Sequence, residues 1–167
     1  IGNYFEISVN QIKEAIEDYI SDNNRSQIIE KGSNKIILDA YNANPTSMLA
    51  ALDSFKSVTS ESKTVILGDM FELGVESYKE HNAIVEFVDN CNFQNSYFVG
   101  EHFFNIGNTN NFFKDYSTLD IYLKKNPLEN QSILIKGSRG MRLERIIKIL
   151  NWCFVYDILK DYLLVFE

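Results

Sequence analysis

The chain has 167 residues, 45% of them hydrophobic, which is enough to fill one sizeable core and leave a short appendage. Its formal net charge of −7 argues against a protein that binds the nucleic-acid backbone, because such a protein needs a basic stripe. Cys91 and Cys153 lie far apart without a Cys-x-x-Cys pair, so neither a disulfide framework nor a zinc site is indicated. We therefore expect a globular, cytoplasmic protein with no signal peptide and no membrane span.

The first part of the chain predicts a helix, a linker and a β-hairpin. Apolar residues at helical spacing predict an amphipathic helix over residues 9–20, and the polar break over 21–26 is typical of a linker. Residues 27–30 and 35–39 are expected to form two strands joined by a turn at 31–34. The first helix therefore stands outside the main unit and is consistent with the tail of a preceding domain.

The rest of the chain alternates strands with helices. Strands are expected at residues 63–67, 96–99, 112–113 and 132–135, and helices at 46–58, about 77–88, 119–123 and from near 141 onward. Such alternation is typical of a largely parallel sheet covered by helices. We therefore predict an α/β fold of the Rossmann-like type: an open, mostly parallel sheet with helices on both faces and an N-terminal β-hairpin.

Three of the expected strands end in polar or glycine-rich turns that lead toward helices. These segments read ILDA-YNANP from residue 37, VILGD-MFELG from residue 65 and ILIKG-SRG from residue 133. Right-handed crossovers place such turns on one edge of the sheet, where open α/β sheets bind ligands. That edge would carry acids, amides and cations together: Asp39, Asn42, Asn44, Asp69, Glu72, Lys136, Ser138 and Arg139.

One loop of this kind is more often only a strand end and a helix cap, because capping and turn chemistry select the same residue types. Three loops on one edge favour a site for an anionic ligand that carries hydroxyl groups. No G-x-x-x-x-G-K-[ST] loop occurs and no G-x-G-x-x-G follows a strand, so any ATP phosphates would be held mainly outside this chain. For His81 we favour a helix-surface or capping role over catalysis, and His102 is a weaker catalytic candidate still.

Three motifs in order resemble the C-terminal domain of the Mur ligases. They are D-A-Y-N-A-N-P-T-S-M at residues 39–48, L-G-D-M-F-E-L-G-x-x-S-x-x-x-H at 67–81 and K-G-S-R at 136–139. Each motif is weak alone, and their combination is specific. Among Mur ligases the chain is most similar to those that join D-alanyl-D-alanine to UDP-N-acetylmuramoyl-tripeptide.

The resemblance implies how the chain is divided. Residues 1–24 would end the family's central ATPase domain and form a linker, and residues 25–150 would be the C-terminal domain. Residues 151–167 would be an extension beyond the usual end of the family domain, and they are too apolar for a free tail. Three explanations of this extension stay open: it covers this domain, it mediates self-association, or it meets another domain.

The resemblance also implies roles for the loops. ATP would contact the linker and the first loop through Arg25, Asp39, Tyr41, Asn42 and Asn44. The later loops would face D-alanyl-D-alanine through Asp69, Glu72, Lys136, Ser138 and Arg139. The missing central domain would supply the phosphate loop and the Mg²⁺ ligands, and a missing N-terminal domain would hold the UDP end of the precursor, so this chain would contain no metal ligand and no complete catalytic set.

The implied reaction is carboxylate activation. ATP would phosphorylate the terminal carboxylate of UDP-N-acetylmuramoyl-tripeptide, and the amine of D-alanyl-D-alanine would attack the acyl phosphate. This chain alone would then be inactive. Two alternatives remain at this point: a non-catalytic α/β module that binds a small ligand or a partner protein, and another amide ligase of the same group, similar to folylpolyglutamate synthetase.

Overall fold

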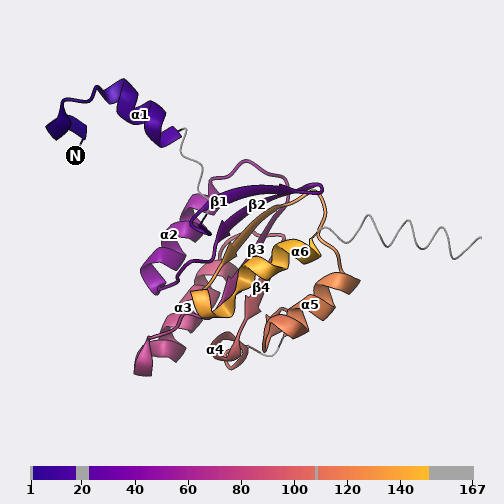
Figure 1. Cartoon of the computed structure of the whole chain (residues 1–167). Helices are drawn as coiled ribbons and strands as arrows, with labels where there is room; N and C mark the ends of the chain where they lie inside the picture. The colour runs from indigo at the N-terminus through magenta and orange to yellow at the C-terminus, as the bar shows by residue number, and fades with distance from the viewer. Residues whose placement is uncertain (1, 18–22, 108, 151–167) are drawn as a thin grey trace, which may run out of the picture.

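The computed structural model describes residues 2–17, 23–107 and 109–150, and Figure 1 shows a six-stranded sheet in the order β1-β2-β6-β3-β4-β5. The strands are β1 (Gln27–Lys31), β2 (Asn34–Asp39), β3 (Lys63–Gly68), β4 (Asn95–Val99), β5 (Phe112–Phe113) and β6 (Ser132–Lys136). Strand β1 runs antiparallel to β2, and every other pair of neighbours in this sheet is parallel. The predicted open, mostly parallel sheet with an N-terminal hairpin is confirmed.

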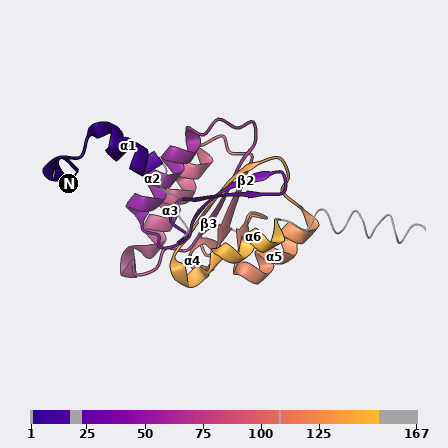
Figure 2. The same ribbon diagram turned by 45° about the horizontal axis from the view of Figure 1, so that its top comes forward.

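Helices cover both faces of the sheet, as predicted (Figures 1 and 2). One apolar core joins the sheet to α2 (Pro45–Lys56), α3 (Ser77–Asp89) and the short α4 (Glu101–Phe104). A second core on the opposite face joins it to α5 (Tyr116–Lys125) and α6 (Ile146–Ile149). The central strand β6 is buried along its whole length, which explains why its sequence is a continuous apolar run and not an alternating one.

The N-terminal segment is helical, as expected. Helix α1 (Val9–Glu17) follows a 3₁₀ helix, η1 (Gly2–Phe5), and residues 18–20 of the predicted helix lie outside the described residues. Val9 and Ile16 are 73% and 70% exposed, so the apolar side of α1 is uncovered here. The predicted roles of residues 151–167 also concern a part of the chain outside the description.

The helices differ most from the prediction at α5 and α6, and the short helix α4 was not predicted. Helix α5 begins at Tyr116, earlier than expected, because Asp115 forms a capping box with Thr118. The helix expected from residue 141 begins only at Ile146, after the 3₁₀ turns η3 (Arg139–Met141) and η4 (Leu143–Arg145). Arg142 has a left-handed φ of 50°, which interrupts an α-helix at that point.

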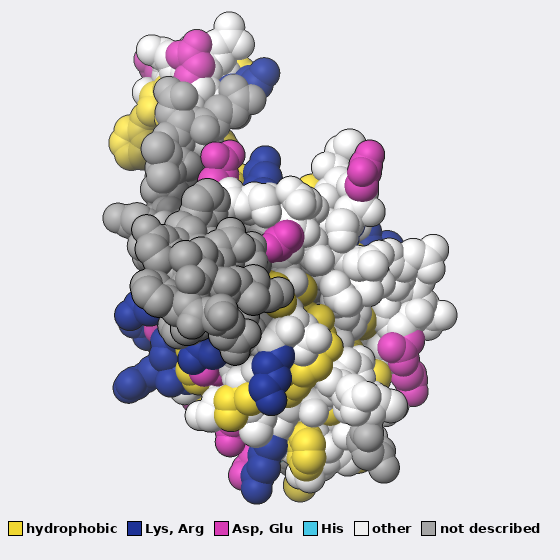
Figure 3. Space-filling model, turned by 90° about the vertical axis from the view of Figure 1, so that its right-hand side faces the viewer, with side chains coloured by type: hydrophobic (Ala, Val, Ile, Leu, Met, Phe, Trp, Pro, Cys, Tyr) yellow, Lys and Arg dark blue, Asp and Glu magenta, His cyan; other side chains and the backbone are white. Residues whose placement is uncertain are grey.

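The described surface shows mixed charge on the side where the β1–β2 turn lies. Figure 3 views this side, and its described Lys and Arg side chains lie among apolar and acidic ones and do not form one continuous stripe. Of the helices in the described ranges, none combines the length and apolar character needed to cross a membrane.

Candidate functional site

The three polar loops lie side by side at the carboxyl edge of the sheet. In the strand register Lys136 of β6 stands opposite Asp39 of β2 and Leu67 of β3, so the three strands end at the same level. The β3 and β6 loops approach closely, since a Cβ atom on Gly137 would lie 3.0 Å from the Cα of Gly68. Glycine is needed at this crossing, and it brings the predicted loops into one site.

A buried ion pair joins the first loop to the third. Lys136 is 1% exposed, and its Nζ donates to Oδ2 of Asp39 at 2.6 Å and to the backbone oxygen of Asn42 at 3.2 Å. Lys136 was expected to face the dipeptide and Asp39 the nucleotide. The structure pairs them with each other, so this lysine connects the two predicted subsites.

Two arginines gather at the ring of Tyr41. The guanidinium carbon of Arg25 lies 3.8 Å from the ring centroid and that of Arg139 lies 5.2 Å from it, both within the range of cation–π attraction. Arg25 comes from the end of the linker and Arg139 from the β6 loop. The ring therefore brings two cations from distant parts of the sequence to the first loop.

The remaining predicted site residues differ in their hydrogen bonds and in their exposure. Oδ1 of Asn44 caps α2 by accepting the Ser47 N–H at 2.8 Å, which is the capping role that one such loop alone suggests. Oδ1 of Asn42 accepts the N–H of Ala43 at 2.9 Å. Glu72 is exposed and has a left-handed φ of 66°. Contacts of these residues with a ligand stay predictions.

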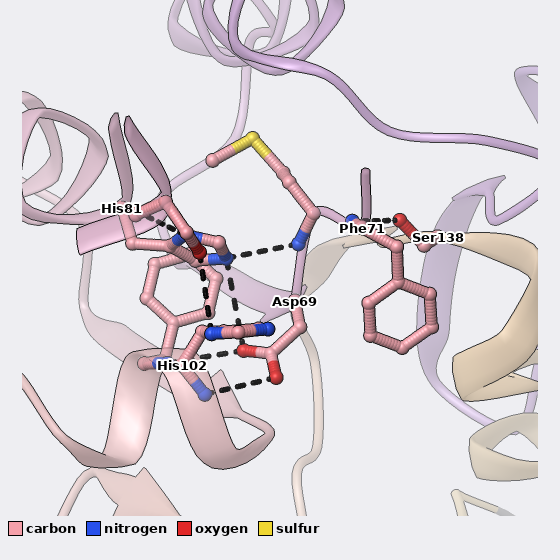
Figure 4. A network of polar contacts seen from close by, with 8 residues as sticks. Asp69, Phe71, His81, His102 and Ser138 are labelled. Atoms are coloured by element: carbon pink, nitrogen blue, oxygen red, sulfur yellow. Dashed lines mark hydrogen bonds and ion pairs between the residues drawn. The ribbon is translucent and has the colours of Figure 1, made fainter. Parts of the chain in front are cut away.

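Asp69 is a buried structural carboxylate at the start of α4. It is 2% exposed, and its two oxygens accept the backbone N–H groups of His102 and Phe103, each at 3.0 Å (Figure 4). Gly100 has a φ of 126°, and a Cβ atom there would lie 2.2 Å from the Asp69 carboxyl carbon. Asp69 thus orients the loop after β4, a segment that was not among the predicted site loops.

His81 is fully buried, so the expectation of a surface histidine is wrong. Its Nδ1 lies 2.7 Å from the backbone oxygen of Ser77, which can only accept, and its Nε2 accepts the Met70 N–H at 2.9 Å (Figure 4). These two bonds require a neutral ring with its proton on Nδ1. Burial also lowers the pKa of His81 below its ordinary value of 6.5, against the smaller opposing influences of the Ser77 carbonyl and Asp69.

Ser138, in the β6 loop, forms hydrogen bonds with the β3 loop that also contacts His81. Its Oγ accepts the Phe71 N–H at 2.9 Å, and its own N–H donates to the backbone oxygen of Asp69 at 3.1 Å. The amides of Met70 and Phe71 are therefore held by side chains from two different elements. The contact between Ser138 and the β3 loop explains how the second and third motifs form one surface.

A cleft of about 450 Å³ opens beside this loop. It is lined by Asp69, Phe71, Gly100, Glu101, His102, Lys114, Asp115, Tyr116, Ser117, Gly140, Met141 and Arg145. Most of these residues were not predicted. Residues 96–102 contain the one available signal, a fourth strand that ends in a glycine turn at the same edge, whereas nothing in the sequence marks Lys114 or Arg145.

The geometry can be compared with known proteins. Residues 24–139 match the family model described as "Mur ligase, glutamate ligase domain". The chain belongs to the Mur ligase family. This Mur ligase chain is 33% identical over 153 residues to the UDP-N-acetylmuramoyl-tripeptide--D-alanyl-D-alanine ligase of Rickettsia prowazekii, covering 88% of this chain and 33% of that protein. It is 35% identical over 159 residues to the ligase of the same name from Bacillus subtilis, covering 88% and 35%.

Solved structures show the same relationship. A MurF structure from Acinetobacter baumannii superposes with a TM-score of 0.73 at 26% identity, covering 87% of this Mur ligase chain and 34% of that one. A Thermotoga maritima MurF ligase in complex with ADP has the same fold, with a TM-score of 0.73 at 19% identity, covering 90% and 35%. The chain thus spans about a third of the length of the relatives it matches.

The described part of this Mur ligase chain offers no obvious metal site. Within residues 2–17, 23–107 and 109–150 there is no group of three or more His, Cys, Asp or Glu side chains that could hold a metal ion. The side chains at the carboxyl edge are instead suited to binding anions and hydroxyl groups, because ammonium and guanidinium groups lie beside carboxylate and amide oxygens.

The buried ion pair predicts an asymmetric response to substitution. Replacing Asp39 with Ala leaves the Lys136 charge buried without its partner and should lower the free energy of unfolding by about 3–5 kcal/mol. Replacing Lys136 with Met should cost less, because the Asp39 side chain is 20% exposed and reaches water. The double variant should lose less than the sum of the two, measured by urea unfolding. Additive losses would contradict a coupled pair.

The buried, neutral His81 predicts a loss of stability in mild acid. Its pKa in the folded chain is below 6.5, so the unfolded chain binds more protons once the pH falls below that value. The free energy of unfolding should therefore level off above about pH 6.5 and fall below it. Urea unfolding at several pH values should show a smaller slope for His81→Gln than for the wild type. An unchanged slope would contradict a buried, neutral His81.

Proposed function

We propose that this chain is the C-terminal domain of an ATP-dependent ligase that adds D-alanyl-D-alanine to UDP-N-acetylmuramoyl-tripeptide through an acyl phosphate. The observation that carries the proposal is the meeting of the three family motifs at one sheet edge, joined by the Lys136–Asp39 and Ser138–Phe71 contacts. The relatives that are 33% and 35% identical to this chain over the aligned residues are named for that activity.

In this proposal the first loop and the linker bind the nucleotide. Asp39 uses one carboxylate oxygen for Lys136 and remains partly exposed, so its other oxygen can accept hydrogen bonds from the ribose hydroxyl groups. Arg25, held over the Tyr41 ring, supplies positive charge to the phosphates. The Thermotoga maritima relative was solved with ADP, which supports nucleotide use. Mg²⁺ and most phosphate contacts belong to the part of the protein upstream of this chain.

We further propose that the cleft beside Phe71 receives D-alanyl-D-alanine. Its carboxylate needs a cation, and Arg145 is positioned for this: its guanidinium donates to the backbone oxygens of Arg142 and Met141 and lies 4.0 Å from the Tyr116 ring centroid. Lys114 lines the same cleft. In this arrangement Asp69 lines the cleft and Ser138 holds the lining residue Phe71. Glu72 and Arg139, each next in sequence to a lining residue, are proposed to serve the dipeptide as well.

We also propose how the chain is divided and where the protein acts. The exposed apolar residues of α1 support the division at residue 24, because a central domain that precedes this chain would cover them. Residues 25–150 are then the C-terminal domain, and 151–167 an extension that covers this domain, mediates self-association or meets another domain. We propose a cytoplasmic location, because the proposed reaction consumes ATP.

Phosphate release by the full-length protein tests the function. With ATP, Mg²⁺ and UDP-N-acetylmuramoyl-tripeptide, D-alanyl-D-alanine should support turnover, whereas glutamate and single alanine should not. The 167-residue chain alone should be inactive, because the phosphate loop is absent from it. Turnover with glutamate would instead favour the folylpolyglutamate synthetase-like alternative. No turnover by a folded full-length protein would favour a non-catalytic module.

The proposed dipeptide cleft predicts a selective kinetic defect. In the full-length protein Arg145→Gln should raise the KM for D-alanyl-D-alanine at least about tenfold, the size expected for losing a hydrogen bond to a charged group, and leave the KM for ATP unchanged. Arg142→Gln is the matched control, since the hydrogen bond from Arg145 goes to the backbone oxygen of Arg142, which this substitution keeps. An equal rise in both KM values would remove Arg145 from the dipeptide site.

A further inference from the structure

The hydrogen bonds around His81 have no part in the reaction proposed above. The ring comes from α3, one helix away from the cleft, and it is sealed from solvent. It packs edge-on against Phe103, with centroids 4.6 Å apart, and lies 5.2 Å from the His102 ring (Figure 4). Both ring nitrogens are hydrogen-bonded, which offsets the cost of burying this polar ring, and the bond from the Met70 N–H joins the ring to the β3 loop.

We propose that His81 is a positioning residue for D-alanyl-D-alanine binding: as a neutral imidazole it holds the β3 loop through the Met70 N–H and so sets the walls of the cleft. This inference rests on the proposed function. His81 acts through the loop and touches neither substrate.

The surrounding hydrogen bonds show why the single contact between His81 and Met70 affects both walls of the cleft. The Met70 N–H goes to His81 and the next amide, Phe71 N–H, goes to Ser138, so the loop is fixed at two successive residues. Phe71 lines one wall of the cleft. Asp69, just before Met70, holds the start of α4, which carries His102 in the other wall. Release of Met70 would loosen both walls.

The charge state of His81 decides whether the contact exists. Nε2 can accept the Met70 N–H only while it carries no proton, and a protonated Nε2 would instead face Oδ1 of Asp69, 3.8 Å away. The titratable groups that face the ring are Asp69 at the end of β3, Glu80 on α3 and His102 on α4. The two carboxylates favour the protonated ring and His102 disfavours it, but burial has the largest effect and keeps the ring neutral.

Two substitutions in the full-length protein separate positioning from packing. His81→Gln places an amide oxygen near the position of Nε2, whereas His81→Asn is too short to reach the Met70 N–H. We expect the asparagine variant to raise the KM for D-alanyl-D-alanine about tenfold, as for loss of one hydrogen bond that orders a site, with the KM for ATP unchanged. The glutamine variant should restore most of the affinity.

The pH profile and a control complete the kinetic test. As the pH falls into the acid range below 6.5, the KM for the dipeptide should rise in the wild type and less so in His81→Gln, which cannot be protonated. Val88→Ala removes buried volume near the other end of the same helix, so it should lower stability and leave both KM values unchanged. Equal effects of the asparagine and control variants on the dipeptide KM would overturn the proposal.

Nitrogen NMR gives a readout that does not depend on activity. The chain has only two histidines, so ¹⁵N-histidine labelling yields two ring spin systems, and His81→Gln assigns them. The His81 ring should carry its proton on Nδ1 at neutral pH, and a proton on Nε2 would overturn the proposal whatever the kinetics show. If the full-length protein does not use D-alanyl-D-alanine, the proposed function fails and the positioning role fails with it, whereas the ring state would still be measured.

Discussion

The ammonium of Lys136 is buried at the centre of the sheet edge, and the carboxylate of Asp39 lies 2.6 Å from it. A buried charge is tolerated only where its partner and hydrogen bonds are in place, so this pair constrains both loops that supply it. The strand register of β2 and β6 sets the two residues opposite each other. The geometry of the nucleotide side and the dipeptide side of the proposed site therefore depends on one interaction.

The remaining loops are arranged around that pair by backbone hydrogen bonds to side chains. Asp69 holds α4, Ser138 holds Phe71 and His81 holds Met70. Each contact satisfies a backbone N–H that would otherwise be unpaired in a partly buried turn. The cleft walls are thus built from the backbone, and a substrate would meet a preorganised surface. The exposed cations, Arg25, Arg139 and Arg145, are in turn held against aromatic rings.

This arrangement is consistent with a domain that completes a site and does not form one by itself. In the proposed function the groups at its edge bind a nucleotide and the carboxylate of a dipeptide, and within the described residues there is no cluster that could hold a metal ion. The chain spans about a third of its relatives' length. In the proposed function, phosphoryl chemistry occurs where this edge meets the upstream part of the protein, and closure of the two would exclude water from the acyl phosphate.

Apart from the short helix α4, the sequence by itself determined the order of strands and helices, the hairpin, the parallel sheet and the three motif loops, because these follow from local periodicity and turn chemistry. The sequence did not predict the late start of α6, because the residue that interrupts the helix in a left-handed conformation is Arg142 and not a glycine. Only the tertiary structure decided that Lys136 pairs with Asp39, 97 positions away, that His81 is buried, and that Arg145 lines a cleft. Contacts between distant residues depend on how the strands and helices pack, and no local pattern encodes them.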